Sequence, residues 1–356
     1  MQFLSRLDTS SLKDLDIYGQ ALMTALCFTG QIERKENVCQ KFRTLHKGLD
    51  RPERMDTSLR RAEAADIIMD RAKSSEVVIL NEAHLYPQHR VFAKSLLAGL
   101  YALGYKHLCM EDLQESARLE NMKIPERSKG YYIQEPCMGD MVREALKLGF
   151  HLHAYDAPAS PRRDSVAARN IQRIRASHPA DKLVVYCGFS HAMEHRSPTC
   201  IASYFKKMTG IDPLTIDQTV YCEREASDYY SRLVQFYAIQ SPSVLLAGDS
   251  IIPLHKAYCD IQVITPPTSY IKGRPHWLLE LDGRQLKEIE DCFQGGIVEV
   301  YYANELTENK EAVPIDVWVV HAQDTRHRYL ALPGEGAFIC KYYQADYTYL
   351  YSVTLP

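Results

Sequence analysis

Between residues 76 and 245, short runs of apolar and β-branched residues alternate with longer segments of helical periodicity. This alternation is typical of a parallel β-sheet whose strands are joined by crossover helices. The runs are short and largely apolar, as strands buried on both faces are. They span residues 77–80, 107–110, 151–155, 183–187, 214–216 and 244–247. The pattern predicts an α/β fold.

The segments between these strands carry the stop signals of helices. Gly104 and Gly149 each follow the last residue of an apolar periodic segment, where glycine commonly ends a helix. The expected helices span residues 90–103, 138–148, 164–177, 202–208 and 223–239.

Both ends of the chain differ from this central region. With 356 residues, the chain is too long for one average core. Residues 1–73 have helical spacing and are expected to form an N-terminal helical segment, followed by an α/β catalytic or ligand-binding domain over 74–248. Residues 249–356 show period-two alternation with Pro and Gly at turns, which predicts a β-rich C-terminal module.

The composition bounds the class of partner. A formal net charge of −3 gives no bulk attraction to nucleic acid or to an anionic membrane. No apolar run approaches the roughly 20 residues that span a bilayer. The ten cysteines are scattered without a CxxC pair, which fits a reducing cytoplasm. The expected partner is therefore a small-molecule or peptide substrate.

Ionisable residues follow four consecutive expected strands. Glu82 and His84 come after the first, Glu111 after the second, Asp156 after the third and His191 after the fourth. In open α/β sheets, ligands bind beyond the carboxyl ends of the strands. An acid after a strand is often only a helix cap, which is the alternative for Asp112, next to Glu111, and for Asp156. We expect these side chains to converge at one edge of the sheet.

Glu82 and His84 are two residues apart, so both side chains point to the same side of an extended chain. A carboxylate and an imidazole at one place can form a base with its orienting partner, or two metal ligands. His191 can add a second imidazole. His195, four residues further on, shares the face of His191 if a helix begins there.

Two further side chains offer other chemistry. Arg169, in the helix expected after the third strand, can reach an anionic substrate or an oxyanion, although a surface position is also open. The run GFSHA is similar to a GxSxG nucleophile elbow with Ser190 as nucleophile. Its triad partners are then Asp249 or Asp260 with His255 or His276, which leaves Glu82 and His84 without a role.

The order of these motifs resembles a known superfamily. The run VVILNEAHLYPQH, a strand ending in Glu111, SVAARNI and VVYCGFSHA are similar to segments of the superfamily that joins the haem-uptake protein ChaN, the erythromycin esterases and the TIKI/TraB metalloproteases. The resemblance covers residues 76 to about 220. By position, Glu82, His84 and His191 match the family's glutamate and two histidines.

The resemblance has looser parts. Arg169 and Asn170 are similar to the arginine helix of the esterase branch. Asn81 stands where the family usually has glycine before the glutamate. One residue separates Glu82 from the following histidine, as in ChaN, whereas the esterases have two.

The resemblance implies a hydrolase that acts on an ester, lactone or amide. His84 is then the general base for a water, Glu82 orients it, and His191 with Arg169 stabilises the oxyanion. The alternative from a different class is a non-catalytic protein that binds haem or a divalent metal (Mn, Co or Zn) through Glu82, His84 and His191. A third is a family member without activity that uses its β-rich module for interactions.

Overall fold

A computed structural model describes residues 12–43, 55–114, 119–194, 199–223, 228–253, 258–289, 293, 295–321 and 328–355. Its centre is a nine-stranded sheet with the order β1-β7-β9-β6-β2-β5-β3-β4, in which β8 pairs with β7. The strands are β1 (Arg60–Glu63), β2 (Val77–Glu82), β3 (Tyr105–Met110), β4 (His151–Ala154), β5 (Lys182–Gly188), β6 (Leu214–Tyr221), β7 (Ser243–Ala247), β8 (Ser250–Ile251) and β9 (Ile261–Ile264).

Most of this sheet is parallel, which confirms the α/β prediction in its general form. Strands β9, β6, β2, β5, β3 and β4 run in one direction. Strand β7, expected as a further member of the parallel series, instead pairs antiparallel with β9, β1 and β8. The sheet also extends past both expected bounds of the domain, since β1 precedes residue 74 and β8 and β9 follow residue 248.

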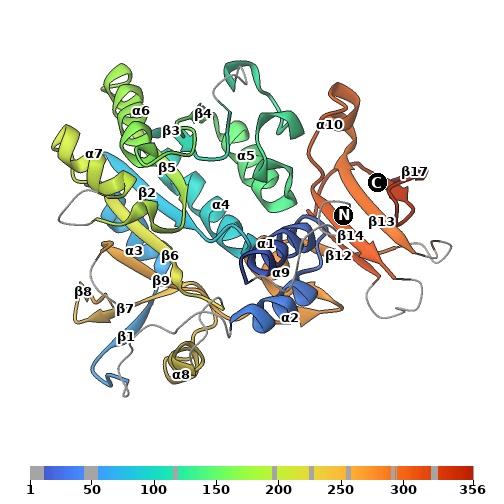
Figure 1. Ribbon diagram of the computed structural model, residues 1–356, viewed down its shortest axis with the longest axis horizontal. Helices are drawn as coiled ribbons and strands as arrows, with labels where there is room; N and C mark the ends of the chain where they lie inside the picture. Colours follow the sequence, from blue (N-terminus) through green and yellow to red (C-terminus); the bar gives the residue numbers. More distant parts are fainter. Residues whose placement is uncertain are drawn as a thin grey trace.

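Helices cover both faces of the sheet (Figure 1). The described helices of the whole chain are α1 (Leu12–Phe28), α2 (Ile32–Arg43), α3 (Ala64–Ala72), α4 (Pro87–Ala102), α5 (Pro136–Leu148), α6 (Arg163–Ser177), α7 (Ile201–Thr209), α8 (Asp228–Phe236), α9 (His276–Glu280) and α10 (Ala303–Glu308). One apolar core joins α3, α4 and α5 to the sheet, and another joins α6 and α7 to its opposite face. The result is a three-layer arrangement.

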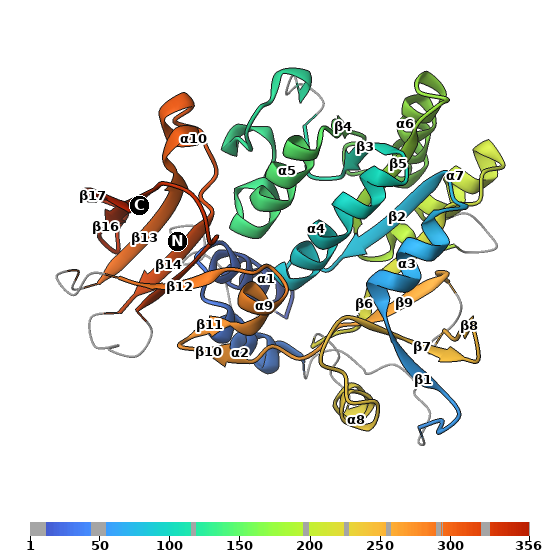
Figure 2. The same cartoon turned by 180° about the vertical axis from the view of Figure 1, so that it is seen from behind.

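The C-terminal region is rich in β-structure, as expected. Strands β14, β13, β16 and β17 form an antiparallel sheet with its own apolar core, and β10 with β11 and β12 with β15 form two-stranded sheets. Their bounds are β10 (Tyr270–Ile271), β11 (Arg274–Pro275), β12 (Gln285–Glu288), β13 (Gly296–Tyr302), β14 (Asp316–Val320), β15 (Tyr329–Leu332), β16 (Phe338–Tyr343) and β17 (Tyr349–Leu355). Figure 2 shows these strands set apart from the nine-stranded sheet.

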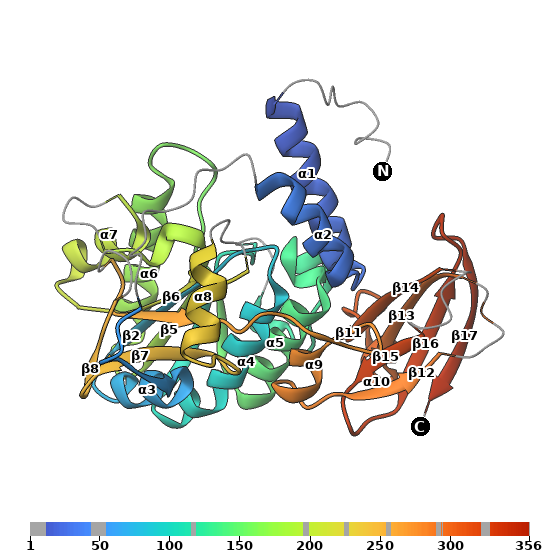
Figure 3. The ribbon, with the colours of Figure 1, turned by 90° about the horizontal axis from the view of Figure 1, so that it is seen from below.

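The described N-terminal helices do not form one layer on the sheet. Helix α3 packs on it, but α1 and α2 lie between α4 and the C-terminal strands (Figure 3). Cys27 and Ile32 there share a core with Val91, Trp277 and Ala331. Among the described residues, no helix combines the length and the apolar character needed to cross a membrane.

The strand order places the expected site. Strand β5 lies between β2 and β3, and β4 is the next strand outward, so the segments that follow all four meet at one edge. The register sets Glu82 beside Gly188, the last residue of β5. The carboxyl ends of these four parallel strands therefore bring Glu82, Glu111, Asp156 and the turn after β5 together.

Candidate functional site

Glu82 is buried at the end of β2 and accepts four hydrogen bonds. Arg90 donates from Nε to Oε2 at 2.7 Å and from Nη2 to Oε1 at 2.8 Å. The Tyr186 hydroxyl donates to Oε2 at 2.7 Å, and His84 Nδ1 lies 2.8 Å from Oε1. Two carboxylate oxygens offer about four acceptor positions, so this set of partners occupies Glu82 fully.

Arg90, on the first turns of α4, fixes this arrangement. It is fully buried and also donates to Glu135 Oε2 at 2.8 Å and to the carbonyl oxygen of His84 at 2.9 Å. Glu135 in turn caps α5 by accepting from the backbone N–H groups of Cys137 and Met138. Burial acts to raise the pKa of Glu82, but the charge and hydrogen bonds of Arg90 outweigh it and hold that pKa well below its usual range.

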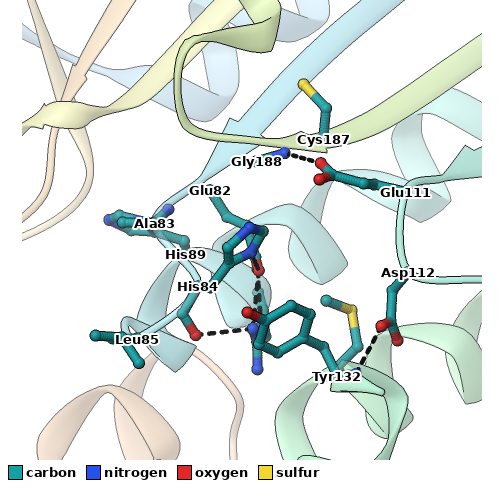
Figure 4. A network of polar contacts seen from close by, with 12 residues as sticks. Glu82, Ala83, His84, Leu85, His89, Glu111, Asp112, Tyr132, Cys187 and Gly188 are labelled. Carbon is teal, nitrogen blue, oxygen red and sulfur yellow. Dashed lines mark hydrogen bonds and ion pairs between the residues drawn. The ribbon is translucent and has the colours of Figure 1, made fainter. Parts of the chain in front are cut away.

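His84 is held on three sides (Figure 4). Its Nδ1 faces Glu82, Tyr132 stacks on the ring with centroids 4.5 Å apart, and Phe189 meets it edge-on at 5.0 Å. The Cε1–Nε2 edge lies against Gly188, where an added Cβ would come within 2.6 Å of Nε2. The ring can therefore take this position only with a glycine at 188. Nε2 itself has no hydrogen-bond partner among the described residues.

Asp112 positions the segment that carries Tyr131 and Tyr132. Its carboxylate accepts hydrogen bonds from the backbone N–H groups of Tyr131, Tyr132 and Ile133 at 2.9, 2.6 and 2.5 Å. These contacts hold the short helical turn that carries Tyr132 over the ring of His84. Asp112 therefore binds the backbone at the start of this turn and orders the loop that carries it.

Asn81 secures the turn that follows β5. Its Nδ2 donates to the carbonyl oxygen of Phe189 at 2.5 Å, and its Oδ1 accepts from the backbone N–H of Gln218 at 2.7 Å. Phe189 has a φ of 39°, which is uncommon for a residue with a side chain. The asparagine, at the position where the resembling family has glycine, thus ties β2 to β6 and to a strained turn.

An arginine joins the acids that follow β3 and β4. Arg163, the first residue of α6, donates from Nη2 to Glu111 Oε1 at 2.5 Å and to Asp156 Oδ2 at 2.6 Å, and from Nε to Asp156 Oδ1 at 2.9 Å. Glu111 also accepts the backbone N–H of Gly188. The Nη1 group of Arg163 contacts only His191 Nε2, at 3.4 Å, within the described residues.

His191 forms a second carboxylate–imidazole pair. Its Nδ1 lies 2.8 Å from Asp164 Oδ2, and its Nε2 lies 4.0 Å from Glu111 Oε1. Burial acts to lower the pKa of His191, but the hydrogen bond to Asp164 and the charge of Glu111 outweigh it and raise that pKa. The imidazolium is thus the favoured form of His191 over a wider pH range than for a free histidine.

Replacing Asp164 with asparagine is expected to lower the pKa of His191. The substitution removes a negative charge and keeps the side-chain size, while the burial that disfavours the imidazolium remains. Titration of the histidine ring signals by NMR measures the shift. Arg169→Met, on the exposed face of the same helix, is the matched control and should leave the titration unchanged. An unchanged His191 titration in Asp164→Asn would contradict the pairing.

A cavity of about 240 Å³ opens between these groups. It is lined by Glu82, His84, Met110, Glu111, Asp112, Gln114, Tyr131, Tyr132, Met138, Asp156, Arg163, Tyr186 and Cys187. His191 is not among these lining residues and reaches the cavity only through its contacts with Arg163 and Glu111. One wall is aromatic and apolar, and the other carries the Arg163 ion pairs.

The geometry does not fit a metal held by Glu82, His84 and His191. Every acceptor position of Glu82 is taken by a donor, and the guanidinium of Arg163 lies beside His191 Nε2. A cation there would face a fixed positive charge. Haem binding through these residues stays a prediction.

Two other predicted residues, Arg169 and Ser190, do not join the cluster. Arg169 is exposed on α6 and makes no hydrogen bond or ion pair within the described chain; Arg163 holds the position expected for it. Ser190 is exposed, and two of its proposed triad partners are engaged elsewhere, since Asp260 accepts from Thr215 and His276 contacts Ser269. His195 and His255 lie outside the described residues.

Sequence reasoning missed several of the residues that build the site. Arg90, Tyr186 and Asp164 each contact one of the predicted side chains. Tyr186 sits within an apolar strand and Asp164 at a helix start, where neither residue type signals a function. The one usable signal was Arg90, a charge among the apolar neighbours Val91 and Phe92 on a helix that follows the motif.

Comparisons with known proteins do not assign a function to this site. No family model matches the chain, and no curated protein matches it. The chain has a likeness to the solved structure titled "The structure of the type III effector HopBA1", with 16% identity, a TM-score of 0.32, and coverage of 46% of this chain and 87% of that chain. A likeness this weak carries no argument, so the assignment of the site depends on its own geometry.

Proposed function

We propose that the protein is a hydrolase that uses His84 to activate a water for attack on an ester, lactone or amide carbonyl. The observation that carries the proposal is the orientation of one ring. A buried, fully bonded Glu82–Arg90 pair holds Nδ1 of His84, and Nε2, beside a cavity, has no partner among the residues that the structure describes. An oriented imidazole with a free nitrogen is the arrangement of a general base.

The proton path follows from this orientation. A carboxylate can only accept, so His84 donates its Nδ1 proton to Glu82 and presents the lone pair of Nε2. Nε2 takes a proton from the water, whose oxygen forms a bond to the carbonyl carbon. The negative Glu82 then stabilises the imidazolium, as the buried carboxylate of a catalytic triad does.

The carbonyl electron pair moves onto oxygen, and a positive donor is needed there. Arg163 is the candidate, since Glu111 and Asp156 fix its Nε and Nη2, while Nη1 has only the long contact of 3.4 Å with His191 among the described residues. Collapse of the tetrahedral intermediate breaks the bond to the leaving oxygen or nitrogen. That atom takes the proton from His84 Nε2, which releases a carboxylic acid and an alcohol or amine.

The aromatic wall favours an acyl group with apolar character. Tyr131, Tyr132 and Met138 line the cavity together with Arg163. Tyr131 also packs against Phe28 of α1, with ring centroids 5.4 Å apart. The N-terminal helix thus supports the wall against which the acyl group would lie.

A panel of small acyl compounds tests the proposal. The full chain is incubated with p-nitrophenyl acetate, p-nitrophenyl butyrate, δ-valerolactone and alanine p-nitroanilide, and acid or chromophore release is measured. Turnover of at least one compound above the buffer rate, abolished in His84→Gln, is expected. If the folded wild-type protein hydrolyses none of them faster than His84→Gln does, the assignment as a hydrolase of this kind is contradicted.

A further inference from the structure

A second group of ionisable side chains lies at the opposite edge of the same sheet. Strands β3 and β4 pair in parallel, with His107 beside His151 and Cys109 beside His153. Because side chains alternate along a strand, the histidines at 107, 151 and 153 share one face of the sheet. His107 lies four residues before Glu111, and His153 lies three residues before Asp156, so the histidines precede the strand-end acids of the candidate hydrolytic site on the same two strands.

The chain returns to this group after α6. His178 follows the last turn of α6 and stacks against His107 with ring centroids 4.0 Å apart, and Asp181 precedes β5. His107 Nε2 lies 3.2 Å from Asp181 Oδ2. Three imidazoles and one carboxylate from three segments of the chain, namely β3, β4 and the turn between α6 and β5, therefore meet at one place.

The distances among these groups suit a metal ion. His107 Nδ1 and His153 Nε2 are 2.8 Å apart. One ring nitrogen from each of His107, His153 and His178 lies within 4.8 Å of the others. Zinc–nitrogen bonds of about 2.0–2.1 Å in a tetrahedral site place two ligand nitrogens roughly 3.3 Å apart. Small ring rotations from the present arrangement reach that spacing.

We propose that His107, His153 and His178 bind a divalent transition metal, with zinc as the best match. Three neutral imidazoles are a preferred zinc ligand set. Asp181 has the position of the carboxylate that orients a metal-binding histidine, since it accepts from Nε2 of His107 and directs Nδ1 toward the other two rings. The ligands stand on or beside rigid strands, which fixes their geometry before the metal binds.

This centre is separate from the hydrolytic site. Helix α6 carries Arg163 and Asp164 at its first turn and is followed by His178. It has 15 residues, and at about 1.5 Å per residue its ends lie roughly 20 Å apart. A metal bound by the histidines therefore does not reach the water that His84 would activate under the proposed function.

A cavity of about 490 Å³ adjoins the cluster and leaves it accessible. Its lining includes His107, His151, His153, His178 and Asp181. The open side can provide a fourth ligand, either a water or the exposed His151. Metal can also enter and leave by this route without unfolding of the sheet.

Zinc binding to the full, untagged chain tests the proposal. After dialysis against EDTA, the wild-type protein is titrated with zinc chloride by calorimetry and by competition with a chromophoric chelator. We expect a tight site with one zinc per chain. His153→Gln and His178→Asn should each weaken binding by about 100-fold or more, and Asp181→Asn by about 10–100-fold, as the loss of a carboxylate that orients a metal-binding histidine does.

Controls locate the metal and show that the variants fold. His84→Gln and Asp164→Asn change the other edge of the sheet and should bind zinc like the wild type. Circular dichroism of each variant checks its fold, and X-ray absorption of the zinc-loaded protein reports imidazole ligation. The proposal is overturned if wild type binds no zinc, or if folded His153→Gln and His178→Asn bind it as tightly as wild type.

Discussion

Replacing His84 with glutamine is expected to lower kcat by about 100-fold or more for any compound that the wild-type protein hydrolyses. General bases contribute about 10²–10⁴-fold, and glutamine keeps the polar character of the side chain but cannot take a proton from water. Steady-state kinetics of the folded variant measures the loss. A variant with wild-type kcat would rule out His84 as the base.

Ser190→Ala is the matched comparison for that experiment. Ser190 is exposed on the turn after β5, so its removal should leave kcat within about twofold of wild type, as expected for a surface group outside the chemistry. The reverse outcome, with activity lost in Ser190→Ala and kept in His84→Gln, would instead support a serine nucleophile at this turn.

Replacing Arg90 with methionine is expected to destabilise the protein by about 3–5 kcal/mol. Methionine keeps the length of the side chain but leaves Glu82 and Glu135 buried without their common cation, and breaking a buried ion pair by removing one partner has a cost of this size. Chemical denaturation followed by circular dichroism measures the free energy of unfolding. The exposed Arg169→Met on α6 should change it by no more than about 0.5 kcal/mol.

The destabilisation by Arg90→Met should depend on pH. In the wild type, the pKa of Glu82 is held low, so the stabilisation is present above the unfolded-state pKa of about 4.3 and is lost as the pH falls through the folded-state value. Without Arg90, burial raises the pKa of Glu82, and the folded state then accommodates the protonated carboxyl. The difference between the two proteins should therefore be larger at pH 7 than near pH 4, and a difference that grows toward acid pH would contradict this role of Arg90.

Much of the sheet follows from the sequence because its signals are local. Each expected strand falls on an observed strand, since short apolar runs bounded by turns and glycine-stopped helices depend only on neighbouring residues. Pairing is not local, and here the predictions were incomplete. Strand β1 comes from the segment expected to be helical, β9 comes from beyond the expected domain, and β7 enters antiparallel.

The candidate site was also predicted only in part. Glu82, His84, Glu111 and Asp156 were predicted from their places at the ends of the expected strands. Strand order and direction bring those positions to one edge. Helices follow a different rule, since which side of a helix faces the crevice depends on its packing. The sequence therefore pointed to Arg169, which is exposed, whereas the arginine in the site is at the start of α6.

Roles were harder to predict than positions. Glu82 was expected either to orient a base or to bind a metal, and only its partners decide between these roles. Arg90 and Tyr186 occupy the lone pairs that a metal would need. Neither contact has a sequence signature, because one partner lies in a helix and the other within an apolar strand.

The central claim is that His84 presents a free Nε2 lone pair to the cavity, and the protonation state of that ring can be measured without knowledge of the substrate. Long-range ¹H–¹⁵N NMR of the ¹⁵N-histidine-labelled protein, with His84 assigned by its loss in His84→Gln, distinguishes the two neutral tautomers. We predict the form with the proton on Nδ1, held by Glu82, and an unprotonated Nε2. A neutral His84 that carries its proton on Nε2 would contradict the account, because that ring could not accept a proton from water in the cavity.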